Sequence, residues 1–179
     1  MESRQSLMDQ ELSSLDIPVE RDIFLRKLIR ELSGSLENVV GIEEASGFIS
    51  IVGQRIGDWM NDEYQKACQS SQLTVSQLPW VLIDLKKRIQ GDFYLISQDD
   101  EKFVLGNRRC PFGELVKERP SMCMMTSNVF GTITAENIGY SKVNVCESIA
   151  CGSNECRVVV YTKQCDAADD DSGREYFQS

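Results

Sequence analysis

Residues 93–105 read FYLISQDDEKFVL, and this stretch decides the fold that the sequence predicts. Two short apolar runs, residues 93–96 and 103–105, are separated by the polar run Gln98, Asp99, Asp100 and Glu101. Apolar and β-branched runs joined by a short polar connection are typical of two antiparallel strands and their turn. We therefore expect a β-hairpin in the middle of the chain.

Upstream of the hairpin the apolar spacing is helical. Apolar residues recur every three or four positions over residues 22–34, 42–68 and 74–89, which predicts three amphipathic helices. Gly47, Gly53 and Gly57 weaken the second of these helices. We interpret them as positions where a neighbouring backbone packs closely, with a bound ligand as the alternative.

Downstream of the hairpin, helix and strand signals alternate. Pro120 and Ser121 are typical of a helix start, so we expect a helix over residues 122–137. Strands are predicted at residues 143–145 and 158–161, the second buried on both faces because it is continuously apolar. This order predicts an α+β fold, with N-terminal helices packed on an antiparallel sheet and one further helix inserted before the last strands.

The length and composition predict one folded unit. The chain has 179 residues, of which 41% are hydrophobic and 26% charged, as in a globular protein with a single core. Residues 20–163 carry the periodic segments and form the predicted domain. We expect residues 1–19 to be a flexible N-terminal arm and residues 164–179 to be an acidic disordered tail.

Charge and hydropathy exclude several classes of protein. The formal net charge of −9 disfavours nucleic acid and anionic membrane surfaces as partners. The polar, acidic start lacks the basic and apolar parts of a secretory signal, and charges interrupt every long apolar stretch. The sequence therefore predicts a cytoplasmic protein without a membrane segment.

Sulfur dominates the residues that can carry chemistry. The chain has seven cysteines and no histidine, and five of the cysteines fall between residues 110 and 156: Cys110, Cys123, Cys146, Cys151 and Cys156. Thiolates are ligands for iron–sulfur clusters and for zinc, whereas every histidine-dependent mechanism is excluded. The long, irregular spacings contain no Cys-x-x-Cys pair, so a shared site has to be assembled by the fold.

Three segments resemble a known family: residues 109–113 (RCPFG), 120–126 (PSMCMMT) and 147–161 (ESIACGSNECRVVVY). They resemble the methanogen output domain family, which is related to the 4-vinyl reductase type of small-molecule-binding domain. The resemblance covers residues 21–163 and implies a compact α+β sensory or output module; it does not imply a reductase. It places family cysteines at Cys110, Cys123 and Cys156, whereas Cys146 and Cys151 look like additions of this sequence.

We predict that Cys110, Cys123 and Cys156 converge in the fold and bind a cofactor, with Cys151 as the fourth ligand and Cys146 as its substitute. An iron–sulfur cluster is favoured and zinc is the alternative, because an asymmetric thiolate set in a sensor-like family suits a redox-responsive centre. Small buried hydrophobes are the structural alternative for these cysteines. The position of Cys123 at a helix start predicts a lowered thiol pKa.

The predicted function is a cytosolic sensory or output signalling module, carrying a cysteine-ligated centre or a small-molecule pocket. Its predicted partner is a signalling protein or a small-molecule ligand. The sequence does not decide whether the chain forms a homodimer. Two alternatives remain: a thiol redox protein without metal, and an interaction scaffold with structural zinc. The sequence contains no catalytic constellation, so we do not expect an enzyme.

Overall fold

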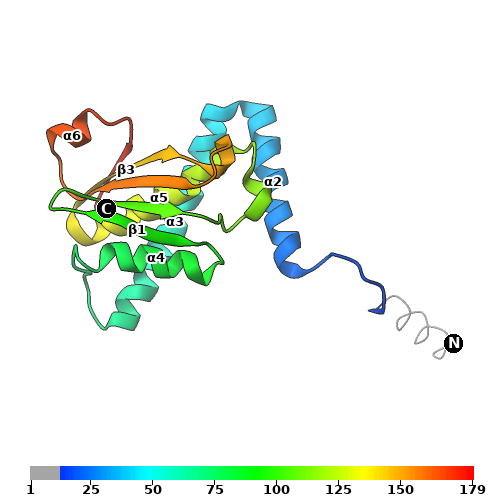
Figure 1. The fold of residues 1–179 in the computed structure, drawn as a ribbon, viewed down its shortest axis with the longest axis horizontal. Coiled ribbons are helices and arrows are strands. Elements are labelled where there is room, and N and C mark those ends of the chain that lie inside the picture. Colours follow the sequence, from blue (N-terminus) through cyan, green and yellow to red (C-terminus); the bar gives the residue numbers. More distant parts are fainter. Residues whose placement is uncertain (1–12) are drawn as a thin grey trace.

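The computed structural model describes residues 13–179 (Figure 1). The first twelve residues of the predicted arm lie outside the described residues. After the arm come three helices: α2 (Arg21–Val40), α3 (Ile42–Cys68) and α4 (Leu78–Arg88). They confirm the predicted N-terminal helices, and the predicted bounds of α3 match.

Helix α2 is longer than its apolar stripe predicted. It does not end near Gly34 but continues to Val40. Gly34 is buried beneath the guanidinium of Arg119, where a Cβ atom would lie 2.9 Å from Nε. The helix therefore uses this glycine for a close approach and ends at Gly41, whose φ of 86° turns the chain into α3.

The sheet has five antiparallel strands in the order β1-β2-β4-β3-β5. Strands β1 (Phe93–Gln98) and β2 (Lys102–Asn107) are the predicted hairpin, and β3 (Tyr140–Glu147) and β4 (Cys156–Tyr161) extend the two later predictions. Helix α5 (Cys123–Ile138) is inserted between β2 and β3. The fold is α+β, as predicted.

The core lies between one face of the sheet and the helices α4 and α5. Its centre is formed by large side chains with almost no exposed surface, namely Leu82, Phe103, Leu105, Phe130, Ile133, Val158 and Val160. Helix α3 packs on the outer side of α5, so the molecule has a sheet layer and two helical layers (Figure 1). At Gly57 a Cβ atom would lie 2.9 Å from the Cβ of Thr132, which confirms close packing at this glycine.

The structure differs from the predicted disordered tail. Residues after Gln164 form the short helix α6 (Asp166–Asp169) and the strand β5 (Arg174–Phe177), which pairs with β3 at the sheet edge. The Tyr176 ring lies on Gly131 of α5, and its hydroxyl is 2.9 Å from that of Ser127. The acidic composition of the segment gave no sign of this strand, because its stability comes from one partly buried aromatic ring and from pairing with a distant strand.

None of the helices described in residues 13–179 has the length and apolar character needed to cross a membrane.

Candidate functional site

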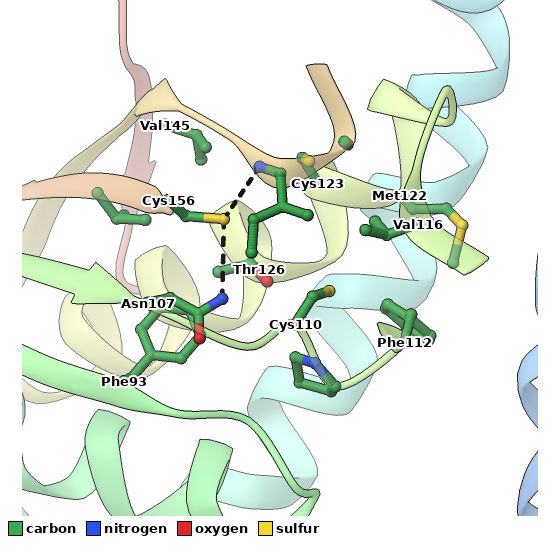
Figure 2. A pocket seen from close by; sticks show the side chains of 14 residues that line it. Phe93, Asn107, Cys110, Phe112, Val116, Met122, Cys123, Thr126, Val145 and Cys156 are labelled. Atoms are coloured by element: carbon green, nitrogen blue, oxygen red, sulfur yellow. Dashed lines mark hydrogen bonds between the residues drawn. The ribbon is translucent and has the colours of Figure 1, made fainter. Parts of the chain in front are cut away.

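Three of the predicted cysteines line one small cavity at the end of the sheet (Figure 2). Cys156 is the first residue of β4, Cys123 is the first residue of α5, and Cys110 lies in the loop after β2. The cavity has a volume of about 30 Å³ and is otherwise mainly apolar, lined by side chains that include Phe93, Phe112, Val116, Met122, Val145 and Val158. A cavity of this size has room for about one water molecule.

The Cys156 sulfur is held by two N–H donors (Figure 2). The Asn107 side chain donates from Nδ2 at 3.7 Å, and the backbone N–H of Ile149 donates at 3.4 Å. Asn107 is itself fixed, because its Oδ1 accepts hydrogen bonds from the backbone N–H groups of Asp92 and Arg109. The thiol of Cys156 therefore has a defined position at the cavity.

Burial governs the other two thiols of the cavity. It raises the pKa of Cys110 above its usual value and raises that of Cys123 to about 11. The predicted lowering at Cys123 is wrong, because burial of the thiol outweighs the effect expected of a helix start, and the 3-10 helix η2 (Pro120–Met122) also precedes this sulfur. Arg108, which lies upstream of Cys123 in the sequence, places its guanidinium over the Tyr94 ring and near Asp92.

The remaining candidate ligands, Cys151 and Cys146, do not line this cavity. Cys151 is exposed in the 3-10 helix η3 (Ile149–Cys151) and lines a separate hollow together with Cys123, and Cys146 is exposed on β3. Within residues 13–179, no three or more His, Cys, Asp or Glu side chains are grouped so that they could hold a metal ion. The cysteines of the cavity thus share a lining without forming a ligand set, and the iron–sulfur cluster and the zinc ion stay predictions.

Lys86 is the functional candidate that the sequence analysis missed. This residue of α4 is only 4% exposed, and its ammonium donates a 2.9 Å hydrogen bond to the Thr126 hydroxyl at the cavity wall. The same ammonium lies 5.5 Å from the ring centroid of Phe93 and 5.1 Å from that of Phe130. Burial lowers its pKa to about 8, and the nearby thiols partly oppose this. The signal was present in the sequence, because Lys86 follows Leu82 by four residues and so shares the apolar face of α4.

A second, larger hollow lies beside the cavity. Between α2 and α3 runs an apolar groove of about 380 Å³, lined by Ile29, Leu32, Leu36, Phe48, Ile49, Val52, Ile56 and Met125, among others. Phe112 and Met122 line both the groove and the inner cavity. These two side chains are therefore the shared wall between an open apolar groove and a closed cavity with polar groups.

Comparison with known proteins agrees with this architecture. The family model described as Methanogen output domain 1 matches residues 28–161. The chain belongs to this family. None of the curated proteins matches this output domain.

Two solved structures resemble the output domain in fold. One is the phenol-responsive sensory domain of the transcription activator PoxR with phenol, at 16% identity and a TM-score of 0.61, covering 86% of this chain and 80% of that chain. The other is trafficking protein particle complex subunit 3 from Naegleria fowleri, covalently bound to palmitic acid, at 9% identity and a TM-score of 0.54, covering 87% and 99%. At these identities the similarity shows a shared fold.

Proposed function

We propose that this output domain is a sensor for a small, mainly apolar molecule that carries one polar oxygen, and that it passes its occupancy to a signalling partner. The observation that carries the proposal is Lys86. Within residues 13–179 its ammonium has a hydroxyl partner and no carboxylate partner: it donates to Thr126, a side chain that lines the cavity together with the Asn107 amide and three thiols. A buried ammonium in such surroundings is costly. Such a group is suited to binding the oxygen of a ligand whose ring or chain lies among the apolar side chains.

The inner cavity has to widen to admit such a ligand. A cavity of about 150 Å³ holds benzene, well above the 30 Å³ found here. Movement of Phe112 and Met122 toward the groove would join the cavity to a space of the size usual for ligand pockets. Ligand entry is thereby linked to the α2–α3 pair, which gives the domain a means to report occupancy.

The fold of the PoxR sensory domain, which was solved with phenol, supports this class of ligand. The thiol redox alternative has less support, because the raised pKa of Cys110 and Cys123 reduces the thiolate fraction at neutral pH.

The proposal is tested with three probes that share an aromatic ring: phenol, benzoate and toluene. We expect phenol or benzoate at millimolar concentration to raise the melting temperature more than toluene does, because only they offer an oxygen to Lys86. Lys86→Met should remove this difference, whereas Lys87→Met, which changes the exposed neighbour on α4, should keep it. The proposal is overturned if no probe raises the melting temperature, or if Lys86→Met retains the preference for the polar probes.

A further inference from the structure

Helix α2 turns its polar side toward its own domain. The Arg30 guanidinium donates from Nη1 to the carbonyl oxygens of Leu115 and Lys117, the latter at 2.8 Å. Further along the helix, Glu37 accepts a hydrogen bond from the Ser121 hydroxyl. An amphipathic helix ordinarily turns its apolar side to the core, so α2 is reversed over this part of its length.

The opposite side of α2 is apolar and exposed. Five of its residues form a surface that we call the apolar stripe: Phe24, Leu25, Leu28, Ile29 and Leu32. Their exposed fractions run from 37% to 56%. Across the groove on α3, Phe48 and Val52 are 54% and 50% exposed. In Figure 1, α2 stands at the side of the molecule, and no other described element lies on its outer face.

The area of this surface fits a protein interface. Seven half-exposed large apolar side chains present roughly 600–700 Å², taking roughly 180 Å² for a fully exposed one. This is at or above the largest apolar patch usual on a monomer, about 300–600 Å². It is close to the roughly 800 Å² that each partner contributes to a stable interface.

We infer that the surface is the interface with a second copy of this chain, in which the two α2 helices pack antiparallel through their apolar stripes. The charges beside the stripe favour this partner. Lys27 and Glu31 lie on the same flank of α2, one turn apart. Lys27 comes two residues before Ile29 and Glu31 two residues after it. In an antiparallel pair centred on Ile29, Lys27 of each copy faces Glu31 of the other, so the surface is complementary to itself, as a two-fold interface requires.

The second copy also closes the ligand site. Its α2 lies over the mouth of the apolar groove, so the groove floor formed by Leu32, Phe48 and Val52 becomes an enclosed space. The dimer is inferred from the apolar stripe and from the charges beside it. This inference does not depend on whether the proposed ligand binds.

Sedimentation velocity of the full chain without added ligand tests the inference. We expect a species of twice the 20.2 kDa chain mass at micromolar concentration. Leu28→Glu should raise the dissociation constant by about 100-fold or more, because each dimer then buries two new charges at the centre of the interface. Ile96→Glu on β1 is the matched control, since Ile96 is 42% exposed and Leu28 is 43% exposed, and it should leave the constant unchanged.

Charge exchange gives a second measurement that does not depend on the apolar residues. Lys27→Glu and Glu31→Lys should each weaken the dimer by about 5-fold to 10-fold, and the double variant should restore the wild-type constant. A monomer at all concentrations, with or without a copurified fatty acid in the groove, would overturn the inference. A dimer that Leu28→Glu leaves intact, or that the double variant fails to restore, would overturn it as well.

Discussion

Replacing Lys86 with methionine should stabilise the protein at neutral pH, and the gain should shrink as the pH rises. Methionine has nearly the shape of the lysine side chain and fills the same space without a charge. The substitution removes the ammonium of Lys86, a residue that is 4% exposed. The neighbours of this ammonium are the Thr126 hydroxyl and two aromatic rings. The folded protein holds this charge at a cost that the unfolded chain does not have.

The size of the effect follows from the pKa. The Lys86 pKa falls from 10.5 in the unfolded chain to about 8 in the fold, chiefly through burial. Each unit of difference corresponds to about 1.4 kcal/mol, so the ionised lysine costs about 3 kcal/mol at pH 7. Between pH 8 and pH 10.5 the unfolded chain binds more protons than the folded one, so the wild-type free energy of unfolding rises with pH. At pH 9 the remaining cost is about 2 kcal/mol.

Urea unfolding followed by circular dichroism at pH 7, 8 and 9 measures this effect. Lys86→Met should exceed the wild type by about 3 kcal/mol at pH 7, and by about 1 kcal/mol less at pH 9. The cysteines titrate in both proteins, so taking the difference largely removes their contribution. Lys87→Met, at the exposed neighbour on α4, is the control for the loss of one lysine charge. A difference for Lys86→Met that stays constant from pH 7 to 9 would refute the reasoning.

The other predictions concern packing and the cysteines. Removing residues 165–179 should lower the melting temperature by about 10 °C because β5 and its partly buried tyrosine are lost, and an unchanged melting temperature would show that β5 is dispensable. In urea unfolding, Gly57→Ala should destabilise by about 1–3 kcal/mol, whereas Gly47→Ala, with open space around it, should stabilise by about 1 kcal/mol; equal effects would contradict the close contact of α3 with α5. Iodoacetamide should modify exposed Cys68 faster than Cys123, as mass spectrometry can measure, and the reverse order would contradict the raised pKa of Cys123. If iron or zinc is bound after anaerobic purification, Cys123→Ser should lose it and Cys68→Ser should keep it, and retention in both would remove Cys123 from the ligand set.

Local patterns predicted most of the fold. The period of the apolar residues predicted α3, and two short apolar runs around a polar turn predicted the β1–β2 hairpin. Strand β5 could not be predicted in this way, because its partner β3 is far away in the sequence and only the fold brings Tyr140 beside Phe177. The end of α2 was missed for a related reason, since Gly34 is stabilised by a side chain from the segment before α5.

The site was predicted in part. The motif positions Cys110, Cys123 and Cys156 do line one cavity, but spacing could not show that Cys151 lies at the surface. The direction of the pKa shift at Cys123 could not be predicted from the sequence either. A helix start favours a thiolate, yet burial among apolar side chains reverses the effect at Cys123, where a further helical turn also precedes the sulfur.

The contact between α3 and α5 has a mechanical consequence. At Gly53 and Gly57 the side chains of Asn128 and Thr132 on α5 pack directly on the backbone of α3, so α3 has no side chain of its own there that could change rotamer to take up a displacement. Helix α5 begins at Cys123 on the cavity, and α3 forms one wall of the groove. A rigid-body movement of α5 at the cavity would therefore also move the groove wall.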